Sequence, residues 1–257
     1  MKLGSLKAGG RDGTLVLVSV DLSKRVDASD IVPTLREAIE SWSRYEPALR
    51  ARAAEIESGE AADAVPFDPA EMASPLPRSF QWADGSAYLS HMRLVRMARG
   101  AELAPDAEVN PLIYQGGSDI FLGPTQDIVI RDTAWGLDFE AEIAVITDDV
   151  PCGTTAVQAG DHIKLVMLCN DVSLREVMRP ELQKGFGFYQ SKPASASSPV
   201  CPTPDELGTA WAGGKLCRPL TSTSHGPWAG PPAAGTARAL RSTTLPPPTP
   251  MLGALRA

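Results

Sequence analysis

Residues 137–146, with the sequence LDFEAEIAVI, combine the alternation of a half-buried strand with two carboxylates. On a strand, residues two apart point to the same side, so Glu140 and Glu142 share one face. Two neighbouring carboxylates repel each other unless water or a cation screens them, which suits a hard divalent metal ion. Taken alone, the pattern is more often a solvated strand face, because charged side chains are mostly exposed.

Short apolar runs separated by Gly, Pro and Asp turns surround this stretch and continue through residues 78–200. Their spacing predicts a largely antiparallel or mixed β-sheet, with strands at residues 126–130, 137–147 and 162–170. The sequence therefore indicates an α+β fold that is mainly β.

The beginning of the chain has a different pattern. Residues 1–7 and 14–20 are apolar runs joined by a glycine-rich turn, which predicts a β-hairpin. Residues 29–58 carry apolar side chains at helical spacing. Pro33 fits the first turn of this helix, and Pro47 is expected to split it. The Ala-, Pro- and acid-rich stretch that follows, residues 59–77, indicates an irregular crossing into a second unit.

Composition excludes several classes of protein. The 257 residues are 43% hydrophobic and 21% charged, the balance of an ordinary globular protein. The net charge of −7 argues against a nucleic-acid or anionic-membrane partner. No apolar run approaches the roughly 18 residues of a spanning helix, and the N-terminus has no signal-peptide pattern. The four cysteines are scattered without a CxxC pair, so the expected location is the cytoplasm.

Three further motifs carry candidate functional residues. Asp171 follows an apolar strand directly, where its carboxylate could meet those of the ExE pair. His91 lies seven residues after Asp84, so both could face one cavity if this segment is helical. Lys192 ends an aromatic, glycine-rich run and could stabilise negative charge. Each alone is more often structural: a turn, a satisfied histidine or a surface lysine.

The order and spacing of these motifs together are more specific than any one of them. They resemble the fumarylacetoacetate hydrolase family, most closely its bacterial members with a small N-terminal domain, over residues 1–223. The motifs that carry the resemblance are Asp84 with His91, YQG at 114–116, EAE at 140–142, NDVSLR at 170–175, and Lys192. The resemblance implies a small hairpin-plus-helix domain (1–72) followed by a mixed β-roll domain (73–223).

The resemblance also implies a role for each matched residue. Mg²⁺ or Ca²⁺ is expected at four carboxylates: Asp84, Glu140, Glu142 and Asp171. His91 matches the base that activates water, and Lys192 matches the lysine that neutralises developing charge. Tyr114 and Arg175 match positions that line the substrate pocket.

The implied reaction is hydrolysis of a C–C bond in a β-diketone acid. Fumarylacetoacetate, which gives fumarate and acetoacetate, and acylpyruvates are the expected substrates, in the breakdown of tyrosine and other aromatic compounds. A homodimer is expected. The alternatives are a decarboxylase or isomerase of the same family, or an inactive, truncated relic that binds a divalent metal without turnover.

The sequence departs from the family pattern at three places. Ser86 replaces a tyrosine, and Gly100 replaces an arginine that contacts substrate. After Thr223 the expected Gly-Ser/Thr-Gly-Thr loop and late glutamate are missing. Residues 224–257 contain 7 of the 23 prolines and lack Asp, Glu, Lys and Val. This tail is expected to be disordered or out of frame, which leaves the β domain incomplete.

Overall fold

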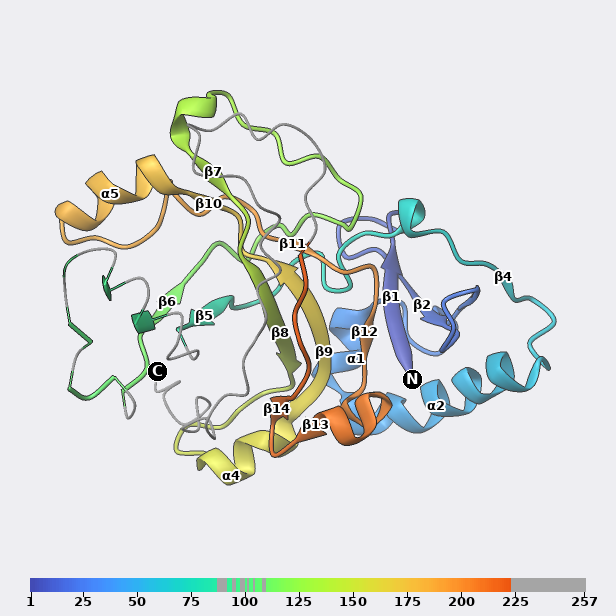
Figure 1. Ribbon diagram of the computed structural model, residues 1–257. Helices are drawn as coiled ribbons and strands as arrows, with labels where there is room; N and C mark the ends of the chain where they lie inside the picture. Colours follow the sequence, from blue (N-terminus) through green and yellow to red (C-terminus); the bar gives the residue numbers. More distant parts are fainter. Residues whose placement is uncertain are drawn as a thin grey trace.

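Strands β8 (Ala141–Thr147) and β9 (Ile163–Asn170) run antiparallel through the middle of the computed structural model (Figure 1). Strand β11 (Ala196–Ser197) pairs with the other edge of β9, which gives the strand order β11-β9-β8. The structure describes residues 1–86, 92–93, 96–97, 100, 102–103, 105–107 and 110–222. The strand predicted at residues 162–170 is confirmed.

A second sheet is built on the N-terminal hairpin, which confirms the prediction for residues 1–20. Its first two strands pair antiparallel, from Lys2 opposite Val18 to Leu6 opposite Thr14. The strand order is β12-β1-β2-β3-β4. Its members are β1 (Lys2–Leu6), β2 (Thr14–Val18), β3 (Lys24–Asp27), β4 (Val65–Pro66) and β12 (Cys201–Pro202). A segment far along the chain thus completes the edge of the N-terminal sheet.

Two helices pack against this sheet, and both expectations about their prolines are wrong. Helix α1 (Leu35–Glu40) begins after Thr34, whose side chain accepts from the Glu37 amide, so Pro33 precedes the helix cap. Helix α2 (Trp42–Ser58) begins after a break at Ser41 and contains Pro47. A proline costs about 3 kcal/mol inside a helix, and the buried apolar face of α2 holds the helix together despite it.

The remaining elements are short. They are β5 (Ala83–Gly85), β6 (Ile113–Gln115), β7 (Leu137–Asp138), α4 (Ala156–Ala159), β10 (Ser173–Leu174), α5 (Arg175–Gln183), β13 (Trp211–Ala212), β14 (Lys215–Leu216), and 3-10 turns at Pro69–Glu71, Thr133–Trp135, Gly160–His162 and Pro204–Ala210. The α+β, mainly β fold class is confirmed.

Two of the predicted strands differ from the structure. Residues 126–130 form no strand, and the side chain of Val129 is 86% exposed instead of packing on a sheet. The predicted strand at 137–147 is divided, because β7 pairs with β10 whereas β8 pairs with β9. Phe139 and Glu140 lie between these two pairings.

One hydrophobic core joins the two sheets. It contains Leu3, Leu17 and Leu35 from the N-terminal part together with Leu165 and Met167 from β9. All five side chains are at most 7% exposed. Near residue 72 the chain therefore passes from one sheet toward the other, and the hydrophobic core continues without interruption across both.

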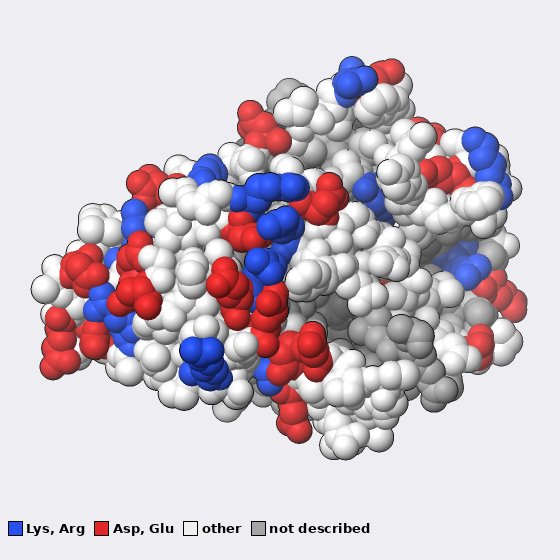
Figure 2. All heavy atoms as spheres, turned by 180° about the vertical axis from the view of Figure 1, so that it is seen from behind, with Lys and Arg blue, Asp and Glu red and all other residues white. Residues whose placement is uncertain are grey.

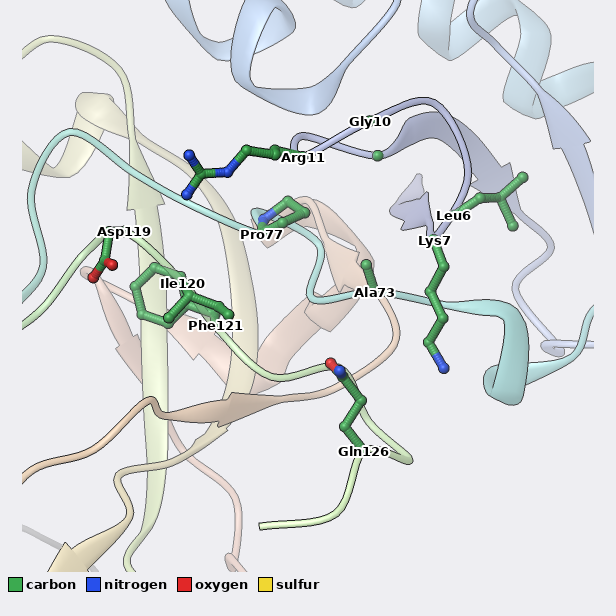
Figure 3. Close-up of a pocket in the computed structure, with 11 residues that line it drawn as sticks. Leu6, Lys7, Gly10, Arg11, Ala73, Pro77, Asp119, Ile120, Phe121 and Gln126 are labelled. Atoms are coloured by element: carbon green, nitrogen blue, oxygen red, sulfur yellow. The ribbon is translucent and has the colours of Figure 1, made fainter. Parts of the chain in front are cut away.

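Ion pairs tie the hairpin turn to the crossing. Asp12 accepts from Arg78 Nη2 at 2.9 Å and from Arg36 Nε at 3.2 Å. Hydrogen bonding by Arg78 is the main cause that lowers the pKa of Asp12 to about 2. Beside this junction lies an open hollow of about 240 Å³ (Figure 3), where Arg11 extends toward the side of Asp119. None of the candidate metal-binding carboxylates lines it.

The surface carries charges of both signs. Among the described residues in the view of Figure 2, acidic and basic side chains lie interspersed instead of forming one continuous basic patch. The part of the chain that the structure describes contains no helix long and apolar enough to cross a membrane.

The joined core leads to a prediction for Leu165→Ala. Leu165 is fully buried, so its truncation should lower the free energy of unfolding by about 2–5 kcal/mol. The same deletion at Leu112, which is 52% exposed, should cost less than about 1 kcal/mol. Urea unfolding followed by fluorescence measures both; equal costs would contradict this assignment of the core.

Candidate active site

The site lies where β9 ends beside the start of β8. Asp171 directly follows β9, and its amide donates to the carbonyl of Glu140 at 3.0 Å. The amide of Glu140 in turn donates to the side-chain oxygen of Asn170 at 3.1 Å. These two bonds fix the backbone so that both carboxylates project from the same end of the sheet.

Lys192 lies between these two carboxylates. Its Nζ donates to Glu140 Oε2 at 2.7 Å and also to Asp171 Oδ2. The side chains of Lys192, Glu140 and Asp171 are only 7%, 13% and 1% exposed. An ammonium and two carboxylates are therefore removed from water together, and their pairing offsets the cost of desolvating them.

Arg175, the first residue of α5, approaches Glu140 from the other side. Its Nη2 donates to Glu140 Oε1, and its Nε donates to Asp138 Oδ2 at 2.7 Å. The Ser173 hydroxyl donates to Glu140 Oε2 at 3.0 Å. Glu140 is thus held by an arginine, a lysine and a serine, and Asp138 fixes the orientation of the arginine.

The β5–β6 pair brings two more predicted residues to the cluster. Asp84 and Tyr114 lie directly opposite each other in the antiparallel register. The Tyr114 hydroxyl lies 2.9 Å from each carboxylate oxygen of Asp171, and Lys192 Nζ lies 5.4 Å from the centroid of the Tyr114 ring. Phe188 packs edge-on against the same ring with the centroids 5.1 Å apart.

The carboxylates have very different electrostatic environments. Burial by itself raises the pKa of Glu140, but Lys192 and Arg175 outweigh this effect and lower it to about 2. Burial raises the pKa of Asp84 to about 8, with contributions from Asp171 and Glu142. Burial also raises the pKa of Glu142 to about 7, with the charges of Glu140 and Asp171 adding to it.

The same environment acts on the cations and on the phenol. Burial lowers the pKa of Lys192, but Asp171 and Glu140 outweigh it and the net direction is upward. Burial and the neighbouring carboxylates raise the pKa of Tyr114. Lys192 is therefore charged and Tyr114 neutral at physiological pH. A neutral phenol keeps the proton with which Tyr114 donates to Asp171.

Seven of the eight predicted site residues lie in the described part of the chain, and the structure brings them together. They are Asp84, Tyr114, Glu140, Glu142, Asp171, Arg175 and Lys192. His91 lies outside the described residues. The sequence placed Asp84 and His91 on one side only if their segment is helical; Asp84 instead lies on strand β5, which pairs with β6.

Three contributors were not singled out from the sequence. Asp138 precedes Glu140 by two residues, so the alternation that pairs Glu140 with Glu142 could also have indicated Asp138. Ser173 lies inside the NDVSLR motif. Ser195, whose hydroxyl lies 3.3 Å from Asp171 Oδ1, has no local signal, because only the chain path after Lys192 brings it there.

The donor chemistry of the site fits a hard divalent cation. Asp84, Glu140, Glu142 and Asp171 are all carboxylates, the ligands that Mg²⁺ and Ca²⁺ prefer, and burial together with neighbouring carboxylates raises the pKa values of Asp84 and Glu142. Within the described residues, however, no three His, Cys, Asp or Glu side chains converge as metal ligands. Lys192 instead lies between Glu140 and Asp171, so metal ligation stays a prediction.

The comparisons with known proteins identify the family. Residues 1–78 match the family model described as fumarylacetoacetase N-terminal domain 2, and residues 81–244 match that of the fumarylacetoacetate (FAA) hydrolase C-terminal domain. The chain belongs to the fumarylacetoacetate hydrolase family. The second match runs to residue 244, further than the likeness over residues 1–223 expected from the motifs. No curated protein sequence matches the chain.

Solved structures share the fold. A probable 2-hydroxyhepta-2,4-diene-1,7-dioate isomerase from Mycobacterium abscessus is 20% identical, with a TM-score of 0.54 over 79% of this chain and 64% of that one. A fumarylacetoacetate hydrolase from Exiguobacterium antarcticum is 18% identical, with a TM-score of 0.54 over 80% and 67%. The chain thus spans about two thirds of the length of these relatives.

A third structure holds a metal ion. It is a maleylpyruvate hydrolase from Sphingobium sp. SYK-6 in complex with manganese(II) and pyruvate. It is 15% identical to this chain, with a TM-score of 0.55 over 80% of this chain and 68% of that one. At these identities the likeness establishes the fold and no particular substrate.

The buried ion pairs lead to a prediction for Lys192→Ala. Without the ammonium, Glu140 and Asp171 remain buried beside each other, so the free energy of unfolding should fall by about 3 kcal/mol. Lys184→Ala removes an exposed lysine from the same segment and should change it by less than about 0.5 kcal/mol. Denaturant titration at pH 7 compares them, and a Lys192 variant as stable as the parent would show that the pairs do not stabilise the fold.

Proposed function

We propose that this protein is a divalent-cation-dependent hydrolase that cleaves a C–C bond in a β-diketone acid. Fumarylacetoacetate and acylpyruvates, intermediates in the breakdown of aromatic compounds, are the substrates of choice. The observation that carries the proposal is the buried cluster of four carboxylates, in which burial and neighbouring charges raise the pKa values of Asp84 and Glu142. Four carboxylates act on one another in the site, and Lys192 and Arg175 are the cations that oppose them.

Mg²⁺ or Ca²⁺ is the proposed cofactor, held by Asp84, Glu140, Glu142 and Asp171. The manganese(II) in the related maleylpyruvate hydrolase supports a divalent cation here, and the all-carboxylate donor set favours a hard ion. When bound, such an ion supplies positive charge that polarises the carbonyl under attack.

The protein's own residues supply the other parts of the reaction. His91 is the proposed base that takes a proton from water, whose oxygen then bonds to the carbonyl carbon. The adjacent C–C bond breaks, its electron pair passes into an enolate, and a proton returned to carbon completes the ketone product. Lys192 Nζ, a buried cation, donates to the oxygen where the enolate charge develops.

Two other residues suit substrate binding. The Arg175 guanidinium reaches Glu140 while its side chain stays 36% exposed, so one side can meet a substrate carboxylate. Tyr114 and Phe188 present aromatic surface beside Lys192, which suits the acyl end of the substrate. Ser86 replaces a family tyrosine and Gly100 replaces the family's substrate arginine, so the acyl group accepted is expected to differ from the family's usual one.

A related candidate is an isomerase or decarboxylase that uses the same enolate chemistry. It is supported by the likeness to a probable 2-hydroxyhepta-2,4-diene-1,7-dioate isomerase. The same residues would serve, because Lys192 can stabilise an enolate however that enolate forms. The products separate the candidates: hydrolysis gives two molecules, isomerisation gives one, and decarboxylation releases CO₂.

The direct test is turnover by the purified chain. With Mg²⁺, Ca²⁺ or Mn²⁺ present, the β-diketone absorbance of acylpyruvates and fumarylacetoacetate should fall, and excess EDTA should abolish the loss. Asp171→Asn should lower kcat/KM by at least about 100-fold, because it alters a proposed ligand and a Lys192 partner. Glu176→Gln, on the exposed face of α5, should retain activity.

Calorimetric titration with the same ions distinguishes the outcomes. Metal binding without turnover on any of these substrates would identify a metal-binding relic. Absence of metal binding together with absence of turnover would overturn the proposal.

We also propose a homodimer, which the face of β8 and β9 opposite the core supports. Val145 and Leu168 on this face are apolar, yet they are 39% and 50% exposed. Their partners in the register, Val166 and Ile143, are apolar as well. Light scattering coupled to size exclusion should give twice the chain mass of 27.3 kDa. Leu168→Glu should give the monomer mass, whereas Val157→Glu, at an 89% exposed position on α4, should not. A monomeric parent protein would exclude this interface.

A further inference from the structure

The carboxylate of Glu181, on the last turns of α5, receives hydrogen bonds from the segment that leads to Lys192. The Gln190 amide donates to Glu181 Oε1 at 2.6 Å, and the Ser191 amide donates to Oε2 at 3.1 Å. The Ser191 hydroxyl donates to the same Oε2. Burial raises the pKa of Glu181, but these bonds outweigh it and the net direction is downward, so the carboxylate is ionised and the bonds are charge-assisted.

The geometry of the chain between these residues makes the contact possible. After α5 the amides of Lys184 and Gly185 bond to the carbonyls of Glu181 and Leu182. Gly185 has a φ of +77°, a conformation that glycine adopts without strain. The chain therefore reverses direction and returns along the helix that it has just left.

Apart from the edge-on contact of Phe188 with the Tyr114 ring, little else holds the returning segment. Phe186 and Tyr189 are 81% and 91% exposed, so the loop buries little apolar surface of its own. Its end is fixed at Ser191, which is fully buried and whose carbonyl accepts from the Leu174 amide at 2.8 Å. Glu181 supplies the side-chain contribution to this fixed end, and Lys192 is the next residue.

Helix α5 positions both of the cations that donate to Glu140. Arg175 at the start of α5 and Lys192 after the loop both donate to Glu140, on different oxygens. Glu181 itself bonds to the loop and not to Glu140 or Asp171. Because one helix holds Arg175 directly and Lys192 through the loop, the two cations keep a fixed spacing around Glu140.

We propose that Glu181 is a positioning residue that clamps residues 190–191 and thereby holds the Lys192 ammonium between Glu140 and Asp171. This inference deepens the proposed function, because Lys192 is there the group that stabilises the enolate. Glu181 acts only through the loop, so its loss displaces the lysine without removing any group that touches substrate.

Chemical labelling of Lys192 tests the clamp independently of activity. Acetic anhydride at limiting concentration acetylates free amines, and peptide mass spectrometry reads each site, with the exposed Lys24 as the internal reference. In Glu181→Gln, acetylation of Lys192 relative to Lys24 should rise about tenfold, because charge-assisted bonds are lost and the loop opens more often. Ser191→Ala, which removes the hydroxyl donor alone, should give a smaller rise.

Glu176→Gln is the matched control. Glu176 lies on the same helix, and its carboxylate is 3.6 Å from Arg179 Nη1 and exposed, so labelling of Lys192 should stay as in the parent. Equal melting temperatures for the variants would separate displacement of Lys192 from general unfolding. If Glu181→Gln does not fold, the acetylation of Lys192 in Ser191→Ala tests the clamp by itself.

Turnover adds a second readout where the parent is active. Glu181→Gln should lower kcat about tenfold with KM changed less than about twofold, because substrate contacts remain and charge stabilisation weakens. Unchanged Lys192 labelling in both clamp variants would overturn the inference, whatever the activity. If the parent has no turnover but labelling rises as expected, the clamp stands and the hydrolase proposal fails.

Discussion

The pairing of β8 with β9 is the constraint on which the site depends. Its register sets Ala141 opposite Asn170 and Glu142 opposite Cys169, so Glu140 and Asp171 leave the pair at the same level. A slip of one residue would turn every side chain of a strand to the opposite face. The core prevents such a slip, because Ala144, Ile146, Leu165 and Met167 all face it.

The charges at the end of this pair stabilise one another only as a set. Glu140 and Asp171 are buried with Lys192 between them, and Arg175 and Tyr114 close the outer sides. Removal of one partner leaves an opposite charge without compensation in a poorly solvated place. The same arrangement holds a cation close to where an enolate would form, so stability and the proposed chemistry rest on the same contacts.

The N-terminal sheet contributes to the site from a distance. The chain continues from Lys192 to strand β12, which pairs with β1. The shared core packs β9 against the N-terminal hairpin and helices. Asp12, bonded to Arg36 and Arg78, fixes the end of the crossing, from which the chain continues to Asp84. The two regions matched by separate family models are therefore joined by a shared core and by strand pairing.

The sequence by itself determined the hairpin and the strand at 162–170, because alternation is a local property, and the order of its motifs pointed to the acidic and basic residues of the candidate site. It could not show that the first helical stretch breaks at Ser41 instead of Pro47, or that Val129 is exposed, because tertiary packing decides these. Only the folded chain brings Lys192 to Asp171 and Glu140, and Glu181 back to Ser191. Such contacts join residues far apart in sequence or across a chain reversal, and their energy comes from burial that no local pattern records.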